Sequence, residues 1–178
     1  MHERFVVRSY LEKDKLAVSK LIQDVFGPHH VGRSVWNLRK ARPIEKLGLI
    51  VEDISLTNEQ LEDKNERIVG SLQFWPIRID NYPSLLFGPL AVKYYLRGLG
   101  VGRLLVEKSL EQIRYREWDF CLLSGEPDYY PKFGFKPVPD NLLWPGPIER
   151  QRLQYIGLKD LDLEKLTNRP LTILSDIG

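Results

Sequence analysis

The feature that most constrains the fold of this chain is a glycine turn, Arg97-Gly98-Leu99-Gly100-Val101-Gly102. It follows an apolar strand, Leu85–Val92, and opens an amphipathic helix, Val101–Arg116. Glycine permits positive φ and leaves backbone N–H groups unshielded, so consecutive amides can face one anion while the helix N-terminus adds its dipole. Arg97 and Arg103 supply full charges suited to diphosphate oxygens. The spacing alone is equally typical of a turn that needs glycine only in order to turn.

Apolar periodicity predicts a mixed α/β (α+β) domain around this turn. We expect strands at Phe5–Tyr10, Leu47–Ile54, Arg67–Ile79, Ser84–Val92, Phe120–Leu123, Phe135–Val138 and Arg152–Ile156, with helices at Glu12–Phe26 and Val35–Ala41 and a helical turn at Asp128–Lys132. The wholly apolar strand Phe120–Leu123 is typical of a strand beside a parallel neighbour. Pro137–Pro147 is expected to form a surface loop, and Leu158–Leu174 carries spaced leucines without clear caps.

Composition narrows the class of protein. The 178 residues, 43% of them hydrophobic, suit one domain with one sizeable core, so we expect a single domain over residues 1–178. The 26 basic and 24 acidic residues nearly cancel and form no long run of like charge, which argues against a nucleic-acid partner. Cys121 has no second cysteine to pair with, and no apolar stretch reaches the ~20 residues needed to cross a bilayer. We therefore expect a cytoplasmic protein without a membrane partner.

Two motifs together resemble the GNAT superfamily of acyl-coenzyme A N-acyltransferases. The stretch Leu90–Gly102 looks like that family's strand followed by Arg or Gln, two residues, Gly, one residue, and Gly or Ala. The stretch Tyr129-Tyr130-Pro131-Lys132-Phe133-Gly134-Phe135 is similar to the family's aromatic-Tyr-x-x-apolar-Gly-Phe signature after the next strand. The order and separation of the motifs agree with the family over about Leu85–Val138, and residues 139–178 would form the C-terminal part of the same domain.

The resemblance implies a GNAT-like sheet, mostly antiparallel and partly parallel, with helices on both faces and splayed strands at the site of acetyl-coenzyme A (acetyl-CoA). Backbone groups before the turn would bind the pantetheine arm, and amides of the turn would bind the pyrophosphate. A Ser hydroxyl would stand where many relatives have an Asn. The cofactor-binding residues implied in this way are Leu90, Ala91, Val92, Arg97, Gly98, Leu99, Gly100, Val101, Gly102, Arg103 and Ser124.

Tyr130 matches the family tyrosine that protonates the departing thiolate. A phenol can stabilise and reprotonate a sulfur anion, and its ordinary pKa of about 10 suits an acid at neutral pH. Tyr129 is the alternative by register. Either ring can instead be a core aromatic on a short helical turn.

The base that deprotonates the amine is open. Glu126 is the carboxylate we assign, with Asp128, His29, His30 and a water relay as alternatives. Catalysis by Cys121 is disfavoured, since an apolar strand holds a neutral thiol and direct transfer needs no covalent intermediate.

The chain is therefore expected to transfer an acetyl group from acetyl-CoA to a primary amine of a small molecule or peptide, without a metal. Phe74 and Trp75 are candidates for the lining of an acceptor pocket. The main alternative is a noncatalytic acyl-CoA-binding or regulatory module. A nucleotide-binding domain would need a Walker lysine, and Gly102-Arg103-Leu104 has none. The oligomeric state is open, a homodimer included.

Overall fold

The computed structural model describes residues 4–57, 59, 64–114, 117–166 and 168–176. The chain divides into two compact units, and the long strands β3 (Ile68–Ile79) and β4 (Tyr82–Val92) run through both. The first unit comprises Met1–Val31, Ile44–Gln73 and Gly88–Glu111, and the second comprises Gly32–Pro43, Phe74–Phe87 and Gln112–Gly178. Asp80 and Asn81 form the tight turn between β3 and β4, which makes these strands the expected hairpin.

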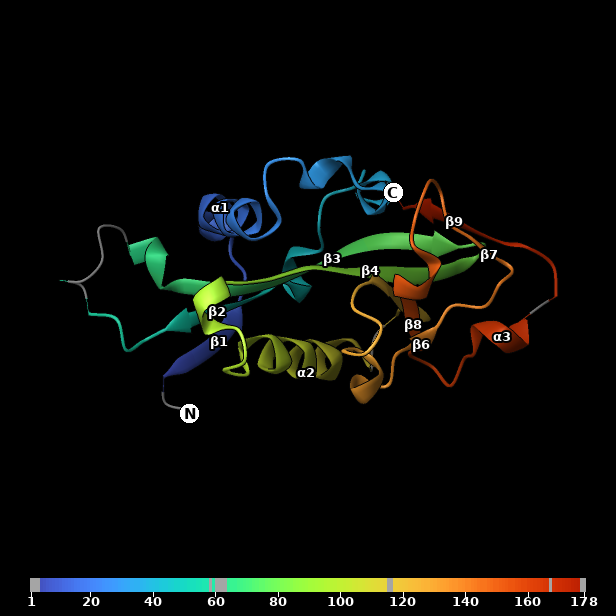
Figure 1. Ribbon diagram of the computed structural model, residues 1–178. Helices are drawn as coiled ribbons and strands as arrows, with labels where there is room; N and C mark the ends of the chain where they lie inside the picture. Colours follow the sequence, from blue (N-terminus) through green and yellow to red (C-terminus); the bar gives the residue numbers. More distant parts are fainter. Residues whose placement is uncertain (1–3, 58, 60–63, 115–116, 167, 177–178) are drawn as a thin grey trace. The chain divides into compact units, whose positions relative to one another are not determined.

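The first unit is an antiparallel sheet with a helix on each face (Figure 1). Strand β1 (Phe5–Ser9) pairs with β2 (Leu49–Asp53), and β2 pairs with β3. Helix α1 (Lys15–Phe26) covers one face and α2 (Val101–Ile113) covers the other. Helix α1 ends at Gly27, whose φ of 80° is readily adopted only by glycine.

A register shift in β3 places Gly70 under α2, the helix that follows the glycine turn. Val51 of β2 pairs with Gly70, whereas the next residue pairs with Ile68, so Val69 is the extra residue of a bulge. Ile68 consequently packs in the core under α1, while the Cα of Gly70 faces α2. A Cβ on Gly70 would lie 3.0 Å from Val101 Cγ1 and 3.1 Å from Leu105 Cδ1. Glycine therefore lets the first turns of α2 lie close against the sheet.

The second unit combines parallel and antiparallel pairs. Strand β5 (Phe120–Ser124) runs parallel to β4 and antiparallel to β8 (Leu153–Gly157), which also pairs with the short β6 (Lys136–Pro137). Strand β9 (Leu171–Ser175) is antiparallel to β3, parallel to β7 (Leu142–Leu143), and preceded by α3 (Leu163–Leu166). The fold is thus the expected mixed α/β type with a mostly antiparallel, partly parallel sheet.

The ladder between β4 and β5 is short. It runs from Ser84–Phe120 to Leu86–Leu122, although β4 continues to Val92 and β5 to Ser124. The last residues of β5 pair instead with β8. The parallel pairing of β4 with β5 therefore covers only Ser84–Leu86 of β4.

Short 3-10 turns connect these elements. They occupy Glu12–Asp14, His30–Gly32, Ser34–Leu38, Glu45–Leu47, Lys64–Arg67, Tyr94–Leu96, Pro131–Phe133 and Arg150–Arg152. The helix expected at Val35–Ala41 is one of these turns, ending at Leu38, and the turn expected at Asp128–Lys132 begins only at Pro131.

Most predicted elements are confirmed, and the departures lie in the second unit. The expected surface loop contains the two residues of β7, and the leucine-spaced tail contains α3 and β9. Helix α2 ends at Ile113, while residues 115 and 116 of its expected range lie outside the described residues. The face expected to be buried on this helix, Val106, Leu110 and Ile113, is at most 5% exposed.

Candidate functional site

The glycine turn has the backbone conformation that its sequence suggests. Gly98 and Gly100 have φ of 82° and 84°, values that side chains with a Cβ rarely adopt. A Cβ at either position would meet nothing within 4 Å, so conformation rather than crowding requires these glycines. Leu104 N–H donates to Gly100 O at 2.9 Å, which closes the first bond of α2. The first amides of a helix lack intrahelical acceptors, so the turn presents open backbone suited to an anion.

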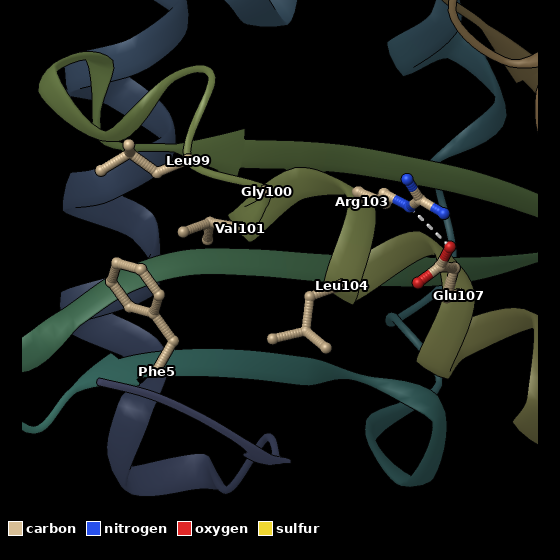
Figure 2. A pocket seen from close by; sticks show the side chains of 7 residues that line it. All are labelled: Phe5, Leu99, Gly100, Val101, Arg103, Leu104 and Glu107. Atoms are coloured by element: carbon tan, nitrogen blue, oxygen red, sulfur yellow. Dashed lines mark hydrogen bonds and ion pairs between the residues drawn. The ribbon is translucent and has the colours of Figure 1, made fainter. Parts of the chain in front are cut away.

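An open hollow of about 310 Å³ lies beside this turn (Figure 2). Its lining residues are Phe5, Leu99, Gly100, Val101, Arg103, Leu104 and Glu107. Arg103 Nε donates to Glu107 Oε1 at 2.8 Å, and both side chains are well exposed. An exposed pair of this kind contributes only ~0.3–0.5 kcal/mol, so an anionic ligand can compete with Glu107 for the guanidinium.

The residues before the turn end β4 in the first unit. Ala91 is fully buried in the core under α1, whereas Leu90 and Val92 are half-buried. Lys93 N–H donates to Val69 O at 2.9 Å, which ties the end of β4 to the bulge in β3. Arg97 follows the 3-10 turn Tyr94–Leu96 and is exposed. All residues assigned to the cofactor from Leu90 to Arg103 thus lie in the first unit.

Tyr130 lies in the second unit within an aromatic cluster. Its ring makes edge-to-face contacts with Phe87 and Phe135, each at 5.8 Å between centroids, and with Tyr129 at 5.0 Å. Burial raises the pKa of Tyr130 above its ordinary value, and the nearby Tyr129 and Glu126 raise it further, while Arg152 lowers it. The phenol therefore keeps its proton at neutral pH and can act as a donor.

Gly125 provides the surface on which Tyr130 lies. A Cβ on Gly125 would be 2.3 Å from Tyr130 Cε2, closer than atoms can approach. Gly125 N–H donates to Arg152 O at 2.9 Å, which fixes the backbone at this point. Glycine after β5 is therefore required for the observed position of the Tyr130 ring.

The assigned base is held by an ion pair. Arg152 Nη1 donates to Glu126 Oε1 at 2.7 Å, and the Glu126 side chain is 71% exposed. Gln154 Nε2 also donates to the backbone carbonyl of Glu126 at 3.3 Å. Ser124, the last residue of β5, is half-buried and pairs with Leu153. Ser124, Glu126 and Tyr130 all belong to the second unit.

The alternatives raised by the sequence occupy different settings. Tyr129 is half-buried with Lys132 Nζ 3.9 Å from its ring centroid, and His30 Nδ1 lies 2.7 Å from Gly27 O. Cys121 is fully buried, and desolvation raises the pKa of its thiol, which opposes a nucleophilic role.

Phe74 and Trp75 follow one another along β3, so their side chains point to opposite faces of the sheet. Phe74 is fully buried and contacts Phe87 at 5.5 Å between centroids. The two residues therefore do not line one surface together, and Phe74 is a core residue.

Sequence reasoning missed three residues around these groups: Gly125, Arg152 and Arg39. Gly125 and Arg152 are brought to Tyr130 and Glu126 by the pairing of β5 with β8, which no local pattern reveals. The position of Gly125 between a strand and a turn was the only local signal.

Among the described residues, no group of three or more His, Cys, Asp or Glu is placed to hold a metal ion. Nor does any described helix have the length and apolarity required to cross a membrane.

Known structures share this architecture. An Escherichia coli GNAT family N-acetyltransferase, YhbS, solved in complex with CoA, superposes with a TM-score of 0.70 over 95% of this chain and 89% of its own, at 22% identity. The chain has the fold of the GNAT N-acetyltransferases. A GNAT acetyltransferase from Brucella melitensis, solved in complex with acetyl-CoA, has a TM-score of 0.61 at 22% identity and covers 88% of this chain and 89% of its own.

The sequence resemblance to the GNAT superfamily is confirmed by these structures together with a curated relative. The uncharacterized N-acetyltransferase ycf52 of Pyropia yezoensis is 27% identical over 106 residues, which is 57% of this chain. The chain spans 59% of the length of that relative. No family model matches the chain.

Proposed function

We propose that this GNAT-fold protein is an acetyl-CoA-dependent N-acetyltransferase in which a primary amine attacks the thioester directly. The observation that carries the proposal is the glycine turn before α2, where Gly98 and Gly100 adopt positive φ with open space in front of them. Solved proteins of the same fold were crystallised with CoA or acetyl-CoA, which supports this choice of donor. The proposal treats residues 1–178 as one acetyltransferase domain.

The donor binds through the backbone in this mechanism. The amides from Gly98 to Arg103 hold the pyrophosphate, Arg97 adds charge-assisted hydrogen bonds, and backbone groups of Leu90, Ala91 and Val92 bind the pantetheine arm. The donor supplies a thioester as the electrophile. Binding by amides suits a cosubstrate that must also leave, because it provides many moderate contacts without a covalent bond.

Proton transfers accompany the exchange of acyl bonds. The amine nitrogen forms a bond to the acetyl carbon as the carbon–sulfur bond breaks, and the amine loses a proton to Glu126 or to solvent. Tyr130 donates its proton to the departing sulfur, and Ser124 contacts the donor at the end of β5. The ion pair with Arg152 orients the Glu126 carboxylate.

Thiol release from acetyl-CoA, measured with a panel of amines, tests the activity. Tyr130→Phe should lower kcat by about 100-fold or more while leaving the affinity for CoA within twofold, because only the proton donor is removed. Tyr129→Phe is the matched control, since it removes the neighbouring hydroxyl from the same aromatic cluster. Equal activity of both variants and the parent protein would remove the role of Tyr130.

Calorimetry with CoA, ATP and NAD tests the donor class. We expect CoA to bind and the two nucleotides to bind far more weakly. Tight binding of CoA without thiol release from any amine would favour a noncatalytic acyl-CoA-binding module. Preferential binding of ATP or NAD would contradict the assignment of the glycine turn to CoA.

A further inference from the structure

A half-buried cation in the second unit, Arg39, has no role in the mechanism described so far. Arg39 follows the 3-10 turn Ser34–Leu38, and its guanidinium carbon lies 4.3 Å from the ring centroid of Trp36 and 5.8 Å from that of Trp75. The two indole rings are 6.1 Å apart at 69°. We call these three residues the Arg39 cluster. Both contact distances are within the range of cation–π interactions.

No carboxylate balances this charge within the described part of the chain, where Arg39 takes part in no ion pair. Arg39 Nε is buried without a hydrogen-bond acceptor, and so is Trp75 Nε1. The surrounding segment, residues 33–42, contains Arg33, Arg39, Lys40 and Arg42 but no Asp or Glu. The region therefore has an excess of positive charge and of buried donors.

The guanidinium is charged at neutral pH in spite of its partial burial. Desolvation lowers the pKa of Arg39 to about 9, which still leaves the group protonated at pH 7. A buried charge without a counter-ion destabilises a folded protein, and stacking on indole rings compensates for this only in part. Retaining such a cation is physically reasonable where an anionic ligand completes the site.

The shape of the group indicates which anion fits. A guanidinium is planar and directs its N–H groups outward in its own plane, where pairs of them match the two oxygens of a carboxylate. One planar cation balances one carboxylate charge. A phosphate group carries more negative charge than one guanidinium balances, and it has more acceptor oxygens than the N–H groups of Arg39 alone can satisfy.

We propose that the Arg39 cluster binds a carboxylate of the amine acceptor, so that the substrates are amines that carry a carboxylate, such as amino acids or peptides. This inference rests on the proposed acetyltransferase function, because it specifies the acceptor of that reaction. Trp75 lines the acceptor in this arrangement, and Arg39 is its specificity-determining residue.

The test compares matched acceptors. Glycine, β-alanine, γ-aminobutyrate, 6-aminohexanoate and glycylglycine are each assayed beside their carboxamides, with O-phosphoethanolamine as the phosphate probe. The series varies the separation of amine and carboxylate, so it needs no assumption about the distance between Arg39 and the acetyl group. We expect at least one free acid to exceed its amide by about tenfold or more in kcat/KM, as a charge-assisted bidentate pair provides.

Variants assign that preference to Arg39. Arg39→Met should abolish the preference for the acid and leave the activity on the amide within about twofold, because only the charged contact is lost. Arg39→Lys should restore part of it, since the charge returns without the planar fork. Arg42→Met is the matched control, because it removes an exposed cation from the same segment and should leave the preference unchanged. A preference that survives in Arg39→Met, or a higher kcat/KM for O-phosphoethanolamine, would overturn the proposal.

Two further measurements separate a binding role from a structural one and from failure of the acetyltransferase assignment. Arg39→Met should keep or raise Tm, because it removes a partly buried charge that has no counter-ion; a lower Tm with an unchanged preference for acids would make the cluster purely structural. Calorimetric titration with the same free acids needs no turnover. Binding of an acid that is lost in Arg39→Met, without thiol release, would retain the carboxylate site and reject the acetyltransferase. Absence of Arg39-dependent binding, whether or not amines are acetylated, would reject the carboxylate site.

Discussion

Gly125→Ala should lower the proposed acetyltransferase activity without removing any functional group. The new Cβ would lie 2.3 Å from Cε2 of Tyr130, 3.0 Å from Cδ2 and 3.2 Å from Cζ, whereas ordinary contacts begin at 3.4 Å. Gly125 is fixed by its 2.9 Å hydrogen bond to Arg152 O, so the tyrosine ring must move. The required displacement is about 1 Å, in a cluster where Phe87 and Phe135 already pack against the ring.

A displacement of this size has separate effects on stability and on rate. Overpacking in a buried cluster destabilises by ~1–3 kcal/mol, measurable by urea unfolding. If Tyr130 delivers a proton to the leaving thiolate, a shift of about 1 Å should also lower kcat by ~100-fold, measurable by thiol release at saturating acetyl-CoA. The affinity for CoA, which we assign to the glycine turn, should change little.

A double variant distinguishes misplacement of the phenol from general damage. When Tyr130→Phe has already removed the hydroxyl, adding Gly125→Ala should lower kcat by less than about threefold, because both substitutions act on one group. Wild-type kcat in Gly125→Ala at undiminished stability would refute the argument that Gly125 positions Tyr130. If Gly125→Ala lowered kcat by the same factor with and without Tyr130→Phe, the two substitutions would not act on one group.

Three further outcomes follow from the structure. Gly98→Ala should weaken CoA binding by calorimetry about tenfold. Gly27→Ala, at a similar φ of 80° against 82° and with equally open space, should strain its own backbone by ~1–3 kcal/mol and leave the CoA affinity unchanged; equal affinities in the two variants would contradict the role of the turn. Asp14 is 1% exposed, and hydrogen bonds from Arg8 lower its pKa, so its stabilisation is present above pH ~4 and lost as pH falls through the folded value. Asp14→Asn should therefore lower the free energy of unfolding by ~2 kcal/mol at pH 7, and its deficit should narrow below pH ~4; a constant deficit down to pH 2 would refute the linkage. Because burial raises the pKa of Tyr130, kcat should show no decline from tyrosine ionisation up to pH ~10, and a falling limb near pH 8 that disappears in Tyr130→Phe would contradict this.

The sequence predicted those features whose signals are local. Periodicity located the main helix with its buried face at Val106, Leu110 and Ile113, and the apolar character of β5 indicated its parallel neighbour. The prediction was less successful where tertiary contacts decide the structure. The segment Ser34–Leu38 forms a 3-10 turn that contacts β9, and β9 itself forms where β3 and β7 provide strands to pair with.

The candidate site divides in the same way. The glycine turn and the motif around Tyr130 could be found from sequence, because glycine spacing and aromatic spacing reflect backbone geometry over a few residues. Of the two candidates for the acceptor pocket, Phe74 is a fully buried core residue, whereas the role of Trp75 stays a prediction, since consecutive strand residues face opposite sides of a sheet. The choice of Tyr130 over Tyr129, and of Glu126 as the base, stays a prediction.

By itself, then, the sequence determined the glycine turn at Arg97–Gly102, the order of the two motifs and the mixed α/β class, because each follows from interactions between neighbours in the chain. Only the tertiary structure decided what surrounds these motifs. Gly125 lies under Tyr130, Arg152 pairs with Glu126, and Arg39 stacks on Trp75 through contacts between residues 5 to 36 positions apart. Such contacts depend on strand pairing and on the burial of charge, which are properties of the folded chain and leave no periodic pattern in the sequence.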